Sequence, residues 1–291
     1  MATHELAGYD VLDTIGHGAR SAVYKVQDRK TKAIFALKHV AKDVMKDERY
    51  IEQIVQEHHI ASTIDHPCLR KTYRLIRVRK MLKVSEIFLV MEYVDGVTLE
   101  QKRLRNIVEF CRICQDAAIG LGVMHEAGYV HSDVKPNNIM LTEDGRVKII
   151  DLGQSCAVGT VKERIQGTPD YIAPEQVKRR ELTPRTDVFG VGAMLYWLLT
   201  NKHIPTLIPK GPAGITIKPD FNIAPPHEIN PKVPLALSTL VMRCISSKPE
   251  DRPGSMSVVY ERLELAINQL LREGVTMDDS GDVTPTRPVV V

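Results

Sequence analysis

The hydrophobic period of this chain changes near residue 95, and that change limits the folds open to it. Before residue 95, runs with the alternation of β-strands occupy residues 9–40 and 75–93, separated by glycine or charged turns. One stretch there, residues 47–64, carries apolar side chains at helical spacing. After residue 95 the spacing is mainly helical, with predicted helices at residues 107–126, 188–199 and 255–272. The sequence therefore predicts an α+β protein with a small antiparallel β-rich part that contains one helix, followed by a larger, mainly helical part.

Composition excludes several classes of protein. Hydrophobic residues make up 43% of the 291 positions and charged residues 26%, which is ordinary for a globular protein. The net charge of +3 is too small to predict a nucleic-acid or membrane-surface partner. The longest apolar run, residues 188–199, is shorter than the ~20 residues that a membrane span needs. Five cysteines, an odd number, and an N-terminus without a signal-peptide pattern favour a reducing compartment, so we expect a cytoplasmic protein.

Two features of the β-rich part are compatible with phosphate binding. Gly16 and Gly18 lie between the first two predicted strands, where a glycine-rich hairpin lets backbone N–H groups approach phosphate oxygens. Lys38 lies in an apolar strand and needs an anionic partner, which Glu57 in the following helix can supply. A flexible hairpin and an edge-strand surface lysine explain the same residues locally, so neither feature alone decides the function.

Residues 131–140, HSDVKPNNIM, carry the strongest chemical pattern of the chain. Asp133 can orient and deprotonate a hydroxyl, and Asn138 offers an amide oxygen to a hard cation. Lys135, between them, can neutralise charge on a transferring phosphoryl group. Asp151 ends an apolar strand next to a glycine, as a metal ligand would. Two carboxylates, one amide and two lysines that meet in one cleft would suit a magnesium nucleotide.

In their order and spacing, these motifs resemble a eukaryotic-like (Hanks-type) Ser/Thr protein kinase domain across residues 9–272. The chain also carries a hinge-like LVMEYVDG, an Ala-Pro-Glu that ends at Glu175, and Arg252, which pairs with that glutamate in the family. The resemblance implies a bilobal protein-kinase-like fold. The implied parts are a nucleotide-binding N-lobe at residues 9–94, a catalytic and peptide-binding C-lobe at 95–274 and a disordered tail at 275–291.

The resemblance also implies a reaction and a role for each motif residue. The γ-phosphoryl group of ATP would pass to Ser or Thr hydroxyls of protein substrates, including the enzyme's own. Asp133 would accept the hydroxyl proton, and Lys135 would steady the γ-phosphate. Lys38, held by Glu57, would position the α- and β-phosphates. The residues that would line the nucleotide site are Ile15, Gly16, Gly18, Val23, Ala36, Lys38, Met91, Glu92, Val94 and Met140.

The implied cofactors and partners follow from the same resemblance. Asn138 and Asp151 would hold Mg²⁺ or Mn²⁺. Proteins with Ser or Thr acceptors are the implied substrates, and we expect neither a nucleic-acid partner nor a membrane span in this chain.

Ser132 departs from the family pattern in a way that bears on regulation. Family members usually carry an arginine at this position, directly before the catalytic aspartate, and that arginine holds a phosphorylated activation loop. We therefore expect the protein to be ordered and active without phosphorylation of the loop at residues 151–175. Thr168 in that loop is expected to order the catalytic loop through its hydroxyl.

Several alternatives stay open at the level of sequence. A pseudokinase scaffold would bind nucleotide without turnover, and a small-molecule kinase can share the His-x-Asp and Asn spacing. The basic residues at 70–83 are compatible with an acidic partner or with a solvated sheet edge. The proline-rich residues 203–234 are compatible with a docking surface or an irregular loop. Cys111 and Cys114 fit a buried helix face better than a metal site.

Overall fold

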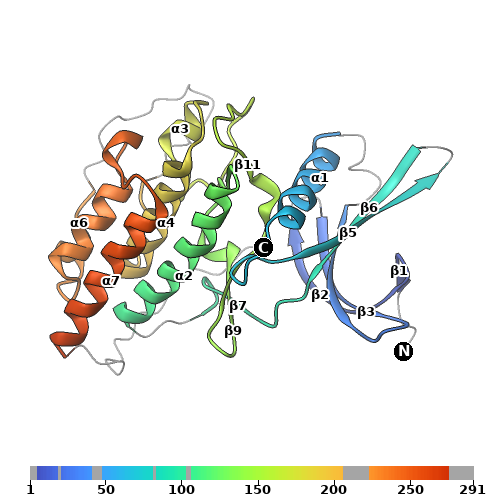
Figure 1. Cartoon of the computed structure of the whole chain (residues 1–291), viewed down its shortest axis with the longest axis horizontal. Coiled ribbons are helices and arrows are strands. Elements are labelled where there is room, and N and C mark those ends of the chain that lie inside the picture. The colour runs from blue at the N-terminus through green and yellow to red at the C-terminus, as the bar shows by residue number, and fades with distance from the viewer. Residues whose placement is uncertain are drawn as a thin grey trace.

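The computed structural model describes residues 5–18, 21–40, 48–80, 83–102, 106–205 and 223–274. The tail expected at residues 275–291 lies outside them, as do residues 206–222 of the proline-rich segment. The described chain forms two lobes, a β-sheet with one helix and a bundle of helices (Figure 1). The bilobal α+β prediction is therefore confirmed.

The first lobe is a six-stranded antiparallel sheet in the order β1-β2-β3-β4-β6-β5. Because side chains alternate across a strand, Leu37 packs on one face with Tyr9 and Val26, whereas Ala36 and Lys38 share the other. Helix α1 (Glu48–Thr63) packs against the sheet near β5. The strands are β1 (Glu5–Leu6), β2 (Tyr9–Gly18), β3 (Ser21–Asp28), β4 (Ile34–Val40), β5 (Thr72–Lys80) and β6 (Lys83–Glu92).

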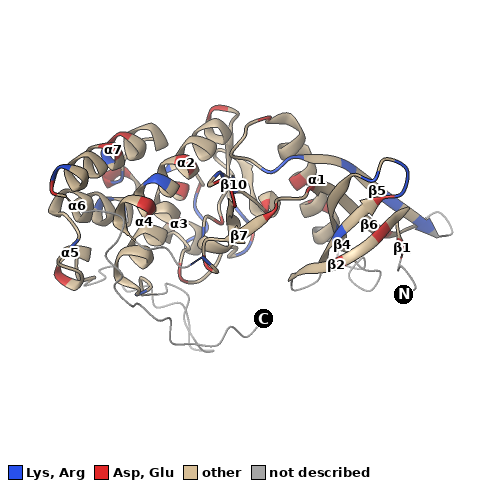
Figure 2. Ribbon diagram, turned by 90° about the horizontal axis from the view of Figure 1, so that it is seen from below, with Lys and Arg blue, Asp and Glu red and all other residues tan. Residues whose placement is uncertain are grey.

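One predicted strand boundary is wrong. The sequence predicts strands at residues 75–84 and 87–93, whereas β5 ends at Lys80 and β6 begins at Lys83. No glycine, proline or asparagine marks the reversal, so nothing in the local chemistry indicates a turn there. β5 is an edge strand, and basic residues colour much of its length in Figure 2.

The second lobe is built on helices whose ends are set by local chemistry. Helix α2 (Ile107–Glu126) begins after Asn106, whose side chain accepts a hydrogen bond of 2.8 Å from the Glu109 N–H. Its inward face includes both Cys111 and Cys114, which confirms the helix-face interpretation. The other helices are α3 (Pro174–Val177), α4 (Pro184–Thr200), α5 (Pro226–Ile229), α6 (Leu235–Cys244) and α7 (Met256–Arg272).

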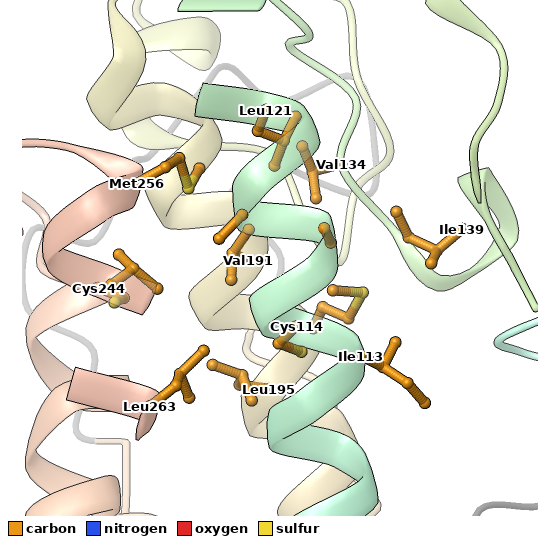
Figure 3. Packing of buried hydrophobic residues seen from close by; sticks show 14 of the residues in the cluster. Ile113, Cys114, Leu121, Val134, Ile139, Val191, Leu195, Cys244, Met256 and Leu263 are labelled. Carbon is orange, nitrogen blue, oxygen red and sulfur yellow. The ribbon is translucent and has the colours of Figure 1, made fainter. Parts of the chain in front are cut away.

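Helix α4 is the centre of this lobe because it is buried on nearly every side. Figure 3 shows Val191 and Leu195 of α4 packed among residues of α2, α6 and α7. At Gly190 a Cβ would lie 2.8 Å from the Cβ of Val134, so only glycine allows this close approach. Helix α4 is thereby in contact with the segment that follows Asp133.

Short strands and 3₁₀ turns complete the second lobe. The dipeptide Asp144-Gly145, between two apolar runs, predicts a hairpin turn. The structure has this hairpin between β9 (Ile139–Thr142) and β10 (Val147–Ile149). Within the described ranges, no helix combines the length and hydropathy of a membrane span. The remaining elements are β7 (Gly96–Thr98), β8 (Tyr129–Val130), β11 (Cys156–Ala157) and the 3₁₀ turns η2 (Pro136–Asn138), η3 (Leu152–Gln154) and η4 (Pro249–Asp251).

Candidate active site

Three charged residues that are far apart in sequence meet between the lobes. Lys38 on β4 places its Nζ 2.7 Å from Oε2 of Glu57 on α1. The same Nζ lies 3.2 Å from Oδ1 of Asp151, which follows β10. Glu57 is buried, with 1% of its side chain exposed, and Arg70 lies 3.5 Å from its other oxygen. The expectation that Glu57 supplies the partner of Lys38 is confirmed.

The mutual attraction of these groups keeps them charged. Burial by itself would lower the pKa of Lys38, but the charges of Glu57 and Asp151 outweigh it and raise that pKa above its usual value. The charge of Lys38 in turn holds the pKa of Asp151 well below its usual value. The ionised Asp151 therefore stabilises the folded protein above about pH 4, and this contribution is lost as the pH falls towards the lowered pKa.

The Asp133 carboxylate is held by donors on both oxygens. Its Oδ1 accepts a hydrogen bond from Oγ1 of Thr168 at 2.8 Å. Its Oδ2 lies 2.9 Å from Nζ of Lys135 and accepts from Nδ2 of Asn138 at 3.2 Å. Lys135 also donates to Thr168 at 2.8 Å, so the hydroxyl of this threonine orders the catalytic loop as expected.

The backbone is strained at Ser132, directly before Asp133, and at Asp151. Ser132 and Asp151 have φ angles of 60° and 61°, in the left-handed region that non-glycine residues rarely occupy. The buried carboxylate of Asp187 on α4 accepts hydrogen bonds of 2.8 Å from the N–H groups of His131 and Ser132. His131 accepts a hydrogen bond of 3.2 Å from the Asp133 N–H and is completely buried, so its role is structural rather than that of a base.

Three of the residues expected around adenine, Val23, Ala36 and Met91, pack together in the first lobe. Ala36 and Met91 are buried in one group, against which Val23 packs, and Met140 lies half-buried on β9 of the other lobe. No described residue hydrogen-bonds to the backbone of Val94, although only 8% of this residue is exposed. The backbone N–H and carbonyl of Val94 are therefore available to hydrogen-bond to the edge of a bound base.

The other residues expected to bind the nucleotide, in the hinge and the glycine loop, match that role only in part. The Glu92 N–H donates to the Lys71 carbonyl at 2.9 Å and is therefore not free to read adenine. A Cβ at Gly16 would lie 3.7 Å from the Cβ of Val23, an ordinary contact, so the chain itself does not require glycine there. Ile15, at the start of this loop, is an exposed apolar side chain, and Gly18 ends β2.

Two side-chain oxygen atoms, Oδ1 of Asn138 and Oδ2 of Asp151, could coordinate a hard cation. The Nδ2 of Asn138 donates to the carbonyl and carboxylate of Asp133, which leaves its Oδ1 as an acceptor. Oδ2 of Asp151 has no hydrogen-bond partner among the described residues, and the side chain is 44% exposed. The described residues hold no cluster of three or more metal-ligating His, Cys, Asp or Glu side chains. One carboxylate and one amide fit Mg²⁺, which usually takes its other ligands from water and substrate phosphates.

Sequence reasoning missed the residues that surround Ser132. The Ser132 hydroxyl donates to the Gln154 carbonyl at 2.7 Å, and Nζ of Lys162 lies 3.2 Å from that hydroxyl and also contacts the same carbonyl. Gln176 donates to the Ser132 carbonyl at 2.8 Å. No spacing predicts these contacts. The lack of a cation at position 132 was the one signal that could have directed attention to Lys162.

A buried ion pair supports the segment that follows. Arg252 forms two hydrogen bonds to Glu175, of 2.7 and 2.9 Å, and both side chains are buried. The expected pairing of these residues is confirmed.

Comparison with known proteins identifies the family. The protein kinase domain family matches residues 9–263 of this chain. The chain belongs to the protein kinase domain family. Its relatives include a probable serine/threonine-protein kinase of Clostridium acetobutylicum, 30% identical over 274 residues, with 91% of this chain and 41% of that protein covered. Serine/threonine-protein kinase A of Synechocystis is 26% identical, with 95% and 56% covered.

A third relative and a solved structure agree with this assignment. PknB of Mycobacterium leprae, a serine/threonine-protein kinase, is 28% identical, with 84% of this chain and 40% of that protein covered. The chain thus spans between about two fifths and just over half of these curated relatives. The crystal structure of the Mycobacterium tuberculosis PknI kinase domain superposes with a TM-score of 0.70 at 22% identity, covering 91% of this chain and 99% of that one, and shows the same fold.

Proposed function

We propose that this protein transfers the γ-phosphoryl group of ATP to Ser or Thr hydroxyls of protein substrates, including its own. One observation carries the proposal: Lys38 forms ion pairs with both Glu57 and Asp151. The Asp133 carboxylate is in turn paired with Lys135. Asn138 links the two groups, because its side chain donates to Asp133 and its carbonyl accepts from the N–H of Ile150, the residue before Asp151. A cation for phosphates and a base for a hydroxyl would thus act side by side.

Lys38 and the hinge account for nucleotide binding. A charged Lys38 that cannot turn away from Glu57 would meet the α- and β-phosphates as a fixed point charge. Val23 and Ala36 would cover one side of the adenine, Met140 the other and Met91 the rear. Ile15, Gly16 and Gly18 would cover the phosphates, while the Val94 backbone and the Glu92 carbonyl would meet the edge of the base.

The site residues fit a divalent cation, which we assign as Mg²⁺, with Mn²⁺ as an alternative. Asn138 and Asp151 would hold it. When bound, the cation neutralises phosphate charge. Asp151 contributes a carboxylate that stays ionised because Lys38 lowers its pKa.

Asp133 is the proposed acceptor of the hydroxyl proton. The Thr168 hydroxyl now donates to this carboxylate at 2.8 Å, which is the kind of contact that a substrate hydroxyl would make. Lys135 would steady the γ-phosphate while it keeps the carboxylate in place. The segment around Thr168 therefore supports Ser/Thr acceptors.

The assignment to lobes and compartment is part of the proposal. We place nucleotide binding in residues 9–94 and catalysis and peptide binding in residues 95–274, joined at the hinge. All five cysteines are free thiols, which supports a reducing compartment such as the cytoplasm. Ion pairs such as Arg252 with Glu175 build a platform for a peptide rather than a small molecule, and we expect no nucleic-acid partner.

A direct assay tests the proposed activity. Radiolabelled ATP and Mg²⁺ are incubated with the protein and a generic basic protein, and the labelled product is hydrolysed to identify the phosphorylated amino acid. Phosphoserine or phosphothreonine is the expected product. ATP binding without transfer would instead identify a pseudokinase, and label in small metabolites alone would identify a small-molecule kinase.

Changing Glu57 to glutamine is expected to lower kcat/KM for ATP by about 10- to 100-fold, because Lys38 loses a charge-assisted partner in a buried site. The measurement is initial rate against ATP concentration. Glu52→Gln, an exposed position on the same helix, is the matched control and should behave as the unaltered protein. Equal losses in both variants would contradict a specific role for Glu57.

Phosphatase-treated and autophosphorylated protein are expected to have initial rates within about twofold of each other, because Ser132 provides no cation for a loop phosphate. Lys162 already donates to Ser132 and to Gln154 in the unphosphorylated chain. A large activation on autophosphorylation would count against this prediction.

A further inference from the structure

Glu57 is held by a second cation besides Lys38. Nη2 of Arg70 lies 3.5 Å from Oε1 of Glu57, while Lys38 lies 2.7 Å from the other carboxylate oxygen. The Arg70 side chain is only 12% exposed, and Glu57 is the one carboxylate of the described residues that pairs with it. A guanidinium keeps its charge even when it is buried. Two cations therefore act on one buried carboxylate, each through its own oxygen.

The backbone of Arg70 belongs to a segment that is fixed to the second lobe. Its N–H donates to the Ile149 carbonyl at 3.0 Å, and the Ile149 N–H donates to the Cys68 carbonyl at 2.7 Å. Leu69 forms a parallel bridge with the same residue of β10. Ile149 ends β10 and lies two residues before Asp151. Arg70 therefore connects α1, through its side chain, to the strand that leads to Asp151, through its backbone.

Helix α1 also packs closely on the turn that follows Asp151. Figure 1 shows α1 on the side of the sheet that faces the second lobe. Ile60 of α1 shares a buried cluster with Leu152 of this turn. A Cβ at Gly153 would lie 3.1 Å from Nε2 of Gln53 on α1, a tight contact. An outward movement of α1 would therefore open this packing as well as the ion pairs of its glutamate.

The charge of Arg70 acts on both carboxylates of the site. The charge of Lys38 and, to a smaller extent, that of Arg70 hold the pKa of Asp151 below its usual value. If α1 moved away, the backbone bonds of Arg70 would keep it at the second lobe, and its guanidinium would lose Glu57. Leaving a buried charge without its partner is strongly unfavourable. The arrangement with Glu57 between its two cations is therefore favoured over one with α1 displaced.

We propose, on the basis of the function proposed above, that Arg70 is a positioning residue that holds α1 where Glu57 contacts Lys38. The protein without nucleotide would then present an assembled nucleotide site, with no partner protein on α1 and no phosphate on the loop at residues 151–175. Arg70 would act through Glu57 and would not touch the nucleotide. The kinase would need no external signal to bring α1 into place.

The distances indicate that Arg70 supports Lys38 rather than competing with it for Glu57. Lys38 keeps the shorter contact, 2.7 Å against 3.5 Å, and each cation meets a different oxygen. A competing arginine would instead draw Glu57 away and lengthen the contact to Lys38. Loss of Arg70 should therefore weaken the site, whereas loss of a competitor would strengthen it. The sign of the effect distinguishes the two roles.

The first test follows α1 itself and needs no catalytic activity. Hydrogen exchange of the amides of Glu48–Thr63 is measured by mass spectrometry in phosphatase-treated protein without nucleotide. In Arg70→Met these amides are expected to exchange about 10-fold faster, because the variant lacks a charge-assisted hydrogen bond at a largely buried site. Arg70→Lys, which keeps the cation, should restore most of the protection. Arg79→Met, at an exposed position on β5, is the matched control and should leave the exchange unchanged.

The second test separates positioning from chemistry. Arg70→Met should raise KM for ATP about 10-fold but lower kcat at saturating ATP by less than about threefold, because bound nucleotide favours the state in which Lys38 meets Glu57. In a Glu57→Gln background, Arg70→Met should raise KM by less than about threefold further, since the two residues act through one contact. Arg70→Lys should again recover most of the loss.

The outcomes separate this inference from the proposed function. If no variant and no unaltered protein transfers phosphate, the proposed function fails, and the exchange of the α1 amides alone decides the inference. Unchanged exchange in Arg70→Met, or a lower KM for ATP, would overturn the inference. An equal effect of Arg70→Met with and without the Glu57 carboxylate would overturn it as well. Thermal unfolding shows that each variant is folded, and Arg70→Gln replaces Arg70→Met if the latter does not fold.

Discussion

Replacing Asp133 with alanine is expected to lower kcat for peptide phosphorylation by about 10²- to 10⁴-fold or more. The carboxylate is the only described acceptor that the structure brings into contact with Lys135, Asn138 and Thr168 together. Without it, the substrate hydroxyl would lose its proposed base, and the three donors would lose the group that aligns them. The loss should appear in kcat, since Lys38 and the hinge, which we propose bind ATP, are unaltered.

The control for this experiment is Asp144→Ala, in the exposed turn between β9 and β10. Initial rates are measured at saturating ATP and peptide, and KM for ATP is measured for both variants. The Asp144 variant should retain normal rates, and both should melt as folded proteins. Near-normal phosphate transfer by the Asp133 variant would refute the assignment of the base.

Replacing Glu175 with alanine is expected to lower the free energy of unfolding by about 3–5 kcal/mol, because it leaves a buried guanidinium without its anion. The Arg252 side chain is 0% exposed and that of Glu175 is 4% exposed. Arg252 also donates to the carbonyls of Ser246 and Arg185, at 2.9 and 2.8 Å, so it cannot turn towards solvent without breaking them. The measurement is the midpoint and slope of denaturant unfolding.

A double variant separates charge from packing. Glu175→Leu combined with Arg252→Met should unfold at a higher denaturant concentration than Glu175→Ala, because no unpaired charge stays buried. It should not return fully to the stability of the unaltered protein, since the Ser246 and Arg185 carbonyls lose their donor. An unchanged midpoint for the single variant would show that the pair is not needed for stability.

Local chemistry explains which elements could be predicted. Helix α2 begins and ends at the predicted residues because Asn106 caps it and Gly128 follows its end. Helix α1 was predicted from the helical spacing of its apolar residues, and the hairpin around Gly145 from its Asp-Gly turn. The reversal between β5 and β6 was missed because its residues continue the basic and apolar alternation of the strands.

The sequence predicted which residues form the site but not the contacts between them. Lys38, Glu57 and Asp151 were expected from motif order, and the structure adds that one Nζ touches both carboxylates. The hinge prediction was less complete, since the Glu92 N–H is bonded to Lys71. The contact between Lys162 and Ser132 had no counterpart in any motif.

By itself, the sequence determined the two-part period of the chain, the ends of helices α1, α2 and α7 to within one residue, and the identity of the chemical groups, because these depend on residues within a few positions of one another. Only the tertiary structure decided that Lys162 meets Ser132 and that Gln176 donates to the Ser132 carbonyl. Such contacts join segments held by Asp187, Gln176 and the packing of α3 and α4, and that packing is a property of the whole lobe.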